Sequence, residues 1–240
     1  MKKYVMTAVL MTAAVCAQAQ QSKPEPYFSF RELPNMLKWC PAPPDTTGAA
    51  FTYDILQYMW GKEMRQNKER ADIAIRDAVY SLECIAQEFS EPFGLQISEE
   101  ETPEIWKLLR DAKATCENIS GFPKYYYKRK RPFMRFQEQT ATPQFEPDLR
   151  RNFSYPSGHT ILGWTSALLL MEINPERADT ILARGMMYGE SRVIVGAHWQ
   201  SDVDAGRLAA AACYARMHTS ERFLEQMRLA RQEFRRKKGE

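Results

Sequence analysis

Apolar side chains recur every three or four positions along most of the chain, a spacing typical of helices. The pattern predicts one helix over 49–60 and one or two amphipathic helices over 62–89. Thr102 and Pro103 predict the start of another helix, as a cap and a first-turn proline. This helix should end near Asn118, with a loop after it. No segment shows a convincing alternation of polar and apolar residues, the pattern of a half-buried strand.

The second half of the chain is more strongly apolar. A helix from Ser157 to Met171 is apolar on nearly all sides, so we expect it at the buried centre of the fold. Further helices should cover 176–188 and 199–217, and a charged helix should begin at Ser220. The predicted fold class is therefore all-α, a compact helical bundle with no linker that divides two cores.

The first 19 residues predict an export signal. Two lysines precede an apolar run that ends at Cys16, and Ala-Gln-Ala at 17–19 offers small residues at a cleavage point, so the mature chain should begin near Gln20. The run is too short to span about 30 Å of hydrocarbon. A lipid anchor on Cys16 is the alternative, disfavoured by the bulky Val15. Export predicts a periplasmic location, or secretion.

Removal of this signal changes both the domain and the charge assignments. Residues 20–48 are rich in proline and predict an extended N-terminal arm, which leaves 49–240 as one helical domain. The formal charge of +3 becomes +1, because two of the 33 basic residues and none of the 30 acidic residues leave. A charge so near zero does not predict a nucleic-acid partner. A mean hydropathy of −0.51 argues against integral membrane association.

The cysteines leave two interpretations open. Cys40, Cys84, Cys116 and Cys213 remain in the exported chain. They could form two disulfides, for which three full pairings exist. They could also be free thiols, because cysteine serves as a small core residue as well.

Three short motifs carry the candidate chemistry, and the first places six residues between Lys124 and Arg131. A stretch rich in lysine and arginine is by itself weak support for function, since a solvated basic surface has the same composition. We therefore give Lys128, Arg129 and Lys130 little weight. Lys124 and Arg131 gain interest only in combination with the other two motifs.

The second motif is Pro156-Ser-Gly-His159, directly ahead of the apolar helix. Ser157 suits the N-cap of that helix. The free N–H groups of Ser157, Gly158 and His159 should point out of the helix end, where the helix dipole favours an anion. Gly158 has no Cβ, so it would let an oxyanion approach the backbone closely.

The third motif begins with Ser191-Arg192 and ends with His198 and Asp202. If a helix begins near His198, Asp202 lies one turn further on the same face. A carboxylate there can accept one imidazole N–H and leave the other ring nitrogen free as a nucleophile. Gly196 should provide the bend between this helix and the one that carries Arg192.

Taken together, these motifs resemble the type 2 phosphatidic acid phosphatase superfamily, which also includes vanadium haloperoxidases. Within it, the chain resembles bacterial class A non-specific acid phosphatases over roughly residues 40–220. Two of the three histidines fall in the motifs, and we interpret the third, His218, as structural. Val195 and Ala197 stand where the family leads us to expect a cysteine and an aromatic residue. Ala197 therefore predicts a changed pocket wall.

The resemblance implies hydrolysis of phosphomonoesters of broad range, without a metal ion or cofactor. His198 would attack phosphorus to form a phosphohistidine, with Asp202 orienting it, while His159 protonates the leaving alcohol. The residues implied in holding the phosphate are Lys124, Arg131, Ser157, Gly158 and Arg192. His198 must start neutral and His159 charged, which predicts a bell-shaped rate profile at mildly acidic to neutral pH. The resemblance also implies a homodimer or larger homo-oligomer.

Other functions compete with this one. A vanadium-dependent haloperoxidase would use the same residues to hold vanadate, although such chains are typically much longer. A membrane lipid phosphatase would need spanning helices, which the hydropathy does not favour. A non-enzymatic exported module could bind phosphorylated ligands. The sequence leaves open the physiological ester, and whether transfer to nucleosides or other alcohols competes with hydrolysis.

Overall fold

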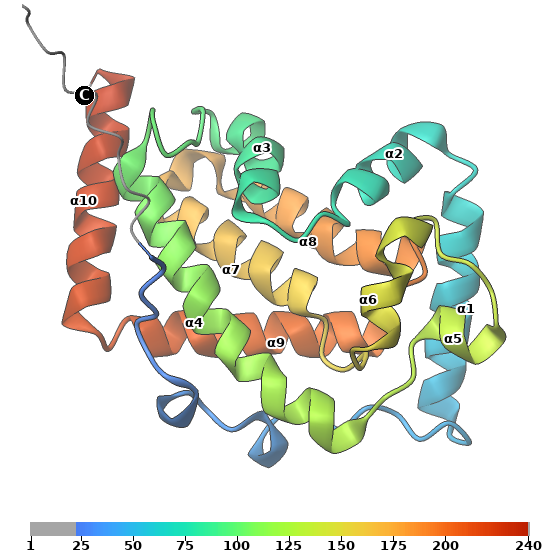
Figure 1. The fold of residues 1–240 in the computed structure, drawn as a ribbon. Helices are drawn as coiled ribbons and strands as arrows, with labels where there is room; N and C mark the ends of the chain where they lie inside the picture. The colour runs from blue at the N-terminus through green and yellow to red at the C-terminus, as the bar shows by residue number, and fades with distance from the viewer. Residues whose placement is uncertain (1–22, 240) are drawn as a thin grey trace, which may run out of the picture.

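The computed structural model describes residues 23–239, so the predicted export signal lies outside them. Every regular element in this range is a helix or a short 3-10 turn and none is a strand, which confirms the all-α prediction (Figure 1). The α-helices in chain order are α1 (Ala49–Met64), α2 (Lys68–Arg76), α3 (Leu82–Phe93), α4 (Pro103–Tyr127), α5 (Pro132–Phe136), α6 (Glu146–Arg150), α7 (Gly158–Ile173), α8 (Ala178–Ile194), α9 (Gln200–Met217) and α10 (Glu221–Lys238).

Helix α7 lies at the centre of the bundle, packed against α8, α9 and α4 (Figure 1). Ten of its sixteen residues are buried, which confirms the position expected for a helix that is apolar on nearly all sides. Close approach of α9 requires Gly206, because a Cβ there would lie 2.9 Å from the carbonyl oxygen of Ser157. This contact brings the second and third motifs together in space.

Helix α4 is longer than predicted. It does not end near Asn118 but continues through Gly121 and Pro123 to Tyr127. The prediction was wrong because a proline removes only its own N–H from the helix, a loss that packing can offset. The extra turns matter for function, since they carry Lys124 into the interior.

The segment 62–89 does not form continuous helix. Helix α2 ends at Arg76 and α3 begins at Leu82, so residues 77–81 form a loop. The side chain of Ser81 caps α3 by accepting the N–H of Cys84 at 3.0 Å. The apolar spacing concealed this break, because Val79 fits the periodic pattern and yet is exposed in the loop.

The segment 23–48 contains two 3-10 turns and no α-helix, and it packs along α4. Tyr27 is buried, and its N–H donates to the hydroxyl of Thr115 at 2.8 Å. The guanidinium of Arg222 on α10 stacks over the Tyr27 ring at 4.4 Å. Leu33 and Met36 also enter the main core. This segment therefore shares the core of the helical bundle.

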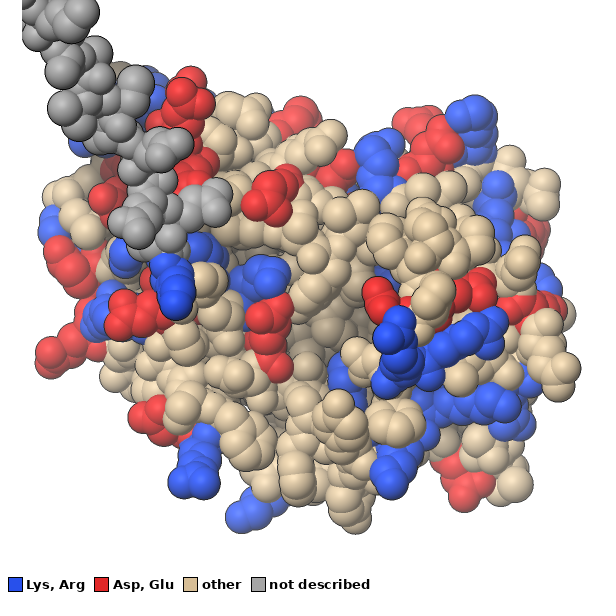
Figure 2. Space-filling view, viewed as in Figure 1, with Lys and Arg blue, Asp and Glu red and all other residues tan. Residues whose placement is uncertain are grey.

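All four cysteines of the described range are buried free thiols, so the structure contains neither of the two disulfides considered above. Lysine, arginine and acidic side chains are interspersed over the visible face, in line with the small net charge (Figure 2). Among the helices between residues 23 and 239, none is long and apolar enough to cross a membrane.

Candidate active site

A cavity of about 540 Å³ opens among α4, α6, the start of α7 and the loop 77–81. Figure 2 shows a recess in the middle of the visible face, bordered mainly by uncharged side chains. Six predicted site residues line the cavity: Lys124, Arg131, Gly158, His159, Arg192 and His198. The other two, Ser157 and Asp202, are fully buried: Asp202 contacts His198, and its carbonyl accepts the N–H of Ser157. The fold thus gathers three motifs that are far apart in sequence.

His198 is held by a hydrogen bond at each ring nitrogen. Its Nε2 lies 2.9 Å from Nη1 of Arg131, and its Nδ1 lies 3.2 Å from Oδ2 of Asp202. Arginine can only donate, so Nε2 must accept and the ring hydrogen must sit on Nδ1. Burial, followed by repulsion from Arg131 and Lys124, holds the pKa of His198 well below its usual range. The imidazole is therefore neutral, with the Nε2 lone pair facing the cavity.

Asp202 reaches His198 from the first turn of α9, which begins at Gln200, one residue after the predicted start of 199–217. Its Oδ2 accepts the N–H of Trp199 at 2.9 Å and the hydroxyl of Ser154 at 2.5 Å. The carboxylate thus caps its own helix while it orients the imidazole. Sequence reasoning did not identify Ser154, although it lies just before the second motif.

Arg129, one of the three basic residues given little weight above, contacts the site with a side chain that is only 9% exposed. It bridges two carboxylates, with Nη1 2.5 Å from Asp202 and Nη2 2.6 Å from Asp54. Lys128 and Lys130 are exposed, as expected. The difference arises because Lys128 adopts a left-handed conformation, with φ of 47°, at the end of α4. The one sequence feature that could have singled out Arg129 is that it is an arginine between two lysines. A guanidinium can bind two carboxylates at once, whereas a lysine ammonium is a single point charge.

Two of the predicted cations are held by main-chain carbonyls. Nζ of Lys124 donates to the carbonyls of Phe153 and Pro156 at 2.8 and 2.7 Å. Nε of Arg131 donates to the carbonyl of Leu149 at 3.0 Å. Burial lowers the pKa of Lys124 well below its usual range and that of Arg131 to about 9. Both side chains therefore have fixed positions before any ligand binds.

Arg192 differs from these two cations because its donors lack partners. The side chain is 1% exposed, yet its Nε and Nη1 form no hydrogen bond anywhere in residues 23–239. Burial lowers its pKa to about 10. Unpaired buried donors cost free energy, and buried charges in proteins are normally paired. An anion in the cavity would accept hydrogen bonds from the two donors and would also pair with the charge of Arg192.

The start of α7 matches the second motif only in part. Ser157 is the N-cap, and its Oγ accepts the N–H of Thr160 at 3.3 Å. The N–H of Ser157 was expected to be free, but it donates to the carbonyl of Asp202 at 3.0 Å. Gly158 faces open space, since a Cβ built there would meet no atom within 4 Å. The approach to this helix end is therefore clear at Gly158.

His159 lies across the cavity mouth from the third motif. Its Nε2 lies 3.1 Å from the carbonyl oxygen of Ala78, so Nε2 donates and Nδ1 is left for other contacts. Burial, followed by repulsion from Arg192, holds the pKa of His159 well below its usual range. This environment favours neutral His159, unlike the charged state expected from the sequence. A bound anion would offset the repulsion and raise this pKa.

Ala197 does not form the pocket wall that the sequence led us to expect. Its side chain is fully buried and packs in a small core with Phe133 and Ile194. Only its carbonyl oxygen bears on the site, because it accepts Nη1 of Arg131 at 2.9 Å. A larger residue here would alter core packing before it altered the cavity.

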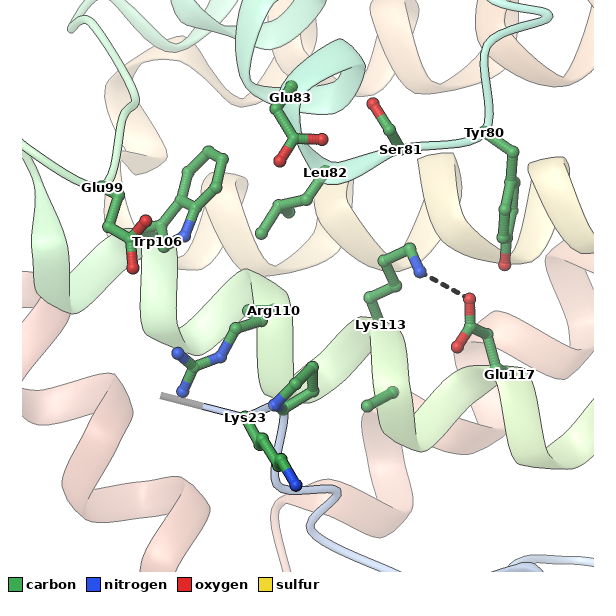
Figure 3. A pocket seen from close by; sticks show the side chains of 12 residues that line it. Lys23, Tyr80, Ser81, Leu82, Glu83, Glu99, Trp106, Arg110, Lys113 and Glu117 are labelled. Carbon is green, nitrogen blue, oxygen red and sulfur yellow. Dashed lines mark hydrogen bonds and ion pairs between the residues drawn. The ribbon is translucent and has the colours of Figure 1, made fainter. Parts of the chain in front are cut away.

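A second cavity of about 520 Å³ adjoins the first and shares Tyr80 and Glu117 with it. Figure 3 shows Tyr80 at one end of this cavity and Trp106 toward the other. Lys113 lies between them, paired with Glu117 at 2.6 Å. The two cavities therefore meet beside Tyr80 and Glu117.

Comparison with known proteins agrees with this geometry. Residues 112–224 match the PAP2 superfamily. The chain is 40% identical over 215 residues to a non-specific acid phosphatase of Providencia stuartii, covering 89% of this chain and 86% of that protein. It is 40% identical over 214 residues to a non-specific acid phosphatase of Salmonella typhimurium, covering 87% and 84%. An acid phosphatase of Zymomonas mobilis is 32% identical over 223 residues, covering 93% and 83%.

A buried imidazole whose Nε2 accepts from Arg131, set among three buried cations, is suited to phosphoryl chemistry, and the chain belongs to the PAP2 superfamily. Its likeness to curated relatives extends over most of both chains. Within the superfamily it is an enzyme of the non-specific acid phosphatase group.

Proposed function

We propose that this enzyme hydrolyses a broad range of phosphomonoesters through a phosphohistidine at His198, without a metal ion, at mildly acidic to neutral pH. The observation that carries the proposal is Arg192, whose buried donors are unpaired beside the Nε2 lone pair of His198. Lys124 and Arg131 add two further cations to the same cavity. These three charges can take the role that a metal ion has in other phosphatases.

In the first step, Arg131 exchanges its contact with His198 for a phosphate oxygen, which frees the lone pair of Nε2. Nε2 attacks phosphorus while the bond from phosphorus to the ester oxygen breaks. A substrate monoanion first gives its proton to Nδ1 of His159, which then passes it to the departing oxygen. The N–H of Gly158 and the hydroxyl of Ser157 supply neutral donors at the helix end.

The phosphorylated imidazole keeps its Nδ1–H and carries a positive charge. Asp202 accepts that hydrogen, and Arg129 holds the other oxygen of the carboxylate in place. In the second step, water gives a proton to Nδ1 of His159 and its oxygen attacks phosphorus. The N–P bond breaks, His198 is again neutral, and His159 gives its proton to the released phosphate and so returns to its own neutral state.

Trapping the intermediate tests this proposal. Protein treated with EDTA, mixed with substrate labelled in its phosphoryl group and quenched with alkali, should hold label that is stable in base and lost in acid. Peptide mapping should place the label on His198, since Nε2 is the free nucleophile of the cavity. Label on any other residue, or activity lost with EDTA and restored by a metal ion, would contradict the proposal.

On the alkaline side of the pH profile, the fall in kcat/KM should follow the phosphate pKa of the substrate rather than a pKa of the enzyme. His159 is neutral in the free enzyme because its pKa lies well below 6.5, so the proton must arrive with a substrate monoanion. The second pKa of a phosphate ester is about 6, and kcat/KM should fall about tenfold per pH unit above it. Esters with different phosphate pKa values should move this limb correspondingly. If kcat/KM instead fell at the same pH for every ester, a group of the enzyme would be responsible, which would contradict the prediction.

Two further proposals concern the cellular setting. We propose that residues 1–19 direct export to the periplasm and are then removed, which N-terminal sequencing of the mature protein should show as a start near Gln20. We also propose that the enzyme forms a homodimer or larger homo-oligomer, as the family resemblance implies.

A further inference from the structure

The loop between α2 and α3, residues 77–81, contacts His159 twice although it belongs to none of the three motifs. The carbonyl of Ala78 accepts Nε2–H of His159 at 3.1 Å. The ring centroid of Tyr80 lies 4.8 Å from that of the imidazole. Because a carbonyl only accepts, this contact selects the tautomer and leaves Nδ1 as the atom for proton transfer. The state of His159 therefore depends on where the loop holds one oxygen atom.

Asp77 anchors that oxygen. It is fully buried and directly precedes Ala78 in the chain. Its carboxylate accepts the hydroxyl of Ser191 at 2.6 Å and both terminal nitrogens of Arg184, all from α8. The loop is thus fixed to α8, whereas His159 itself is carried by α7.

The same anchor reaches the phosphate site through the backbone. Ser191 directly precedes Arg192, and its hydroxyl also accepts Nη1 of Arg70 at 3.0 Å. Asp77 therefore ties the loop that orients His159 to the helical turn that carries Arg192. Its carboxylate is absent from the cavity wall, so it does not touch the substrate.

We propose that Asp77 is a positioning residue for acid–base catalysis by His159, fixing the Ala78 carbonyl so that Nε2 stays protonated and Nδ1 faces the leaving oxygen. The inference rests on the proposed function, in which His159 protonates that oxygen. One proton passes from Nδ1 to the leaving group, and the attacking water returns one to Nδ1. Asp77 exchanges no proton in either step, and it acts by holding geometry.

The test uses the dependence on the leaving group. An alkyl phosphate needs the proton from His159, whereas 2,4-dinitrophenyl phosphate releases a stable phenolate without it. In Asp77→Asn, kcat/KM for the alkyl ester should fall about 100-fold, within the usual contribution of a general acid. For the dinitrophenyl ester it should fall no more than about threefold, because phosphate binding and His198 are intact. His159→Ala should also lose kcat/KM for the alkyl ester selectively. The size of that loss is the reference against which Asp77→Asn is compared.

An equal fall for both esters in Asp77→Asn, or no fall for either, would overturn the inference. If His159→Ala itself shows no selectivity, the proposed role of His159 fails instead. If His159→Ala is selective and Asp77→Asn is not, the proposed function stands and only the role of Asp77 is wrong.

Two more variants cover the case in which Asp77→Asn does not fold. Ser191→Ala removes one partner of Asp77 and should lower the ratio of alkyl to dinitrophenyl kcat/KM about tenfold, and an unchanged ratio would overturn the inference. Glu88→Gln is the matched control, since Glu88 contacts Arg184 at 3.0 Å without touching Asp77. It should leave the ratio unchanged. The ¹⁵N shifts of His159 should show Nε2–H in wild type and a mixture of tautomers in Ser191→Ala.

Discussion

His198→Ala should lower kcat/KM for p-nitrophenyl phosphate by about 10⁴-fold or more, the scale seen when a covalent nucleophile is removed. The imidazole of His198 has its accepting nitrogen held in place among the cations, since Arg131 donates to Nε2 and Asp202 accepts from Nδ1. The same variant should form no base-stable phosphoenzyme. Steady-state kinetics and labelling on one preparation check both results.

His218→Ala is the matched control for this loss. His218 lies outside the cavity, where its Nε2 contacts Glu172 at 3.0 Å and its ring packs on Phe223. Its removal should lower the thermal midpoint while leaving kcat/KM of the folded enzyme within about twofold of wild type, because it touches no part of the site. Residual activity of His198→Ala near the wild-type level would overturn the assignment of the nucleophile.

Arg192→Met should lower the activity of the enzyme and raise its stability. We expect kcat/KM to fall about 10³-fold, as when a preorganised cationic donor to the transition state is lost. We also expect the free protein to gain about 1–3 kcal/mol, because two unpaired buried donors disappear and methionine fills similar space. The pKa of about 10 expresses the same cost, since burial disfavours the charged form of Arg192. Thermal unfolding with and without inorganic phosphate measures this effect.

Inorganic phosphate should stabilise wild type more than Arg192→Met, because the ligand supplies the missing partner. Arg207→Met is the control, since Arg207 pairs with Asp204 on α9 and does not line the cavity. It should leave kcat/KM nearly unchanged. A fall in the thermal midpoint of Arg192→Met would show that Arg192 is mainly a packing residue, and would contradict its role as an unpaired anion ligand.

Much of the fold could be predicted from apolar spacing, because each helix buries a stripe whose period is fixed by helix geometry. The central position of α7 followed directly from a run that is apolar on nearly all sides. One boundary was wrong, and the division of 62–89, which the sequence left at one or two helices, depended on a contact across space. Helix α4 passed through Pro123, where packing outweighed local propensity, and the segment 62–89 broke at Asp77, where a buried carboxylate bonds to α8.

In the site, too, some residues could be identified from the sequence and others only from the tertiary structure. Motif spacing identified Lys124, Arg131, Arg192, His159 and His198, and all five line one cavity. Arg129 was missed because nothing in a basic stretch shows which side chain turns inward. Asp54 and Ser154 were missed because a carboxylate or hydroxyl becomes functional only through what lies across space from it. The importance of Asp77 depends on its contacts with α8, which no spacing in the sequence indicates.

The sequence by itself determined the chemical inventory of this phosphatase: a helical bundle, two histidines and three cations that line one cavity, and a near-neutral charge. Residue types and their spacing carry that information because they are properties of the chain. Only the tertiary structure decided which nitrogen of each imidazole bears the hydrogen, that burial lowers the pKa of both histidines, and that two donors of Arg192 have no partner within residues 23–239. Tautomer, pKa and hydrogen-bond satisfaction depend on burial and on groups brought together by folding, which no local pattern specifies.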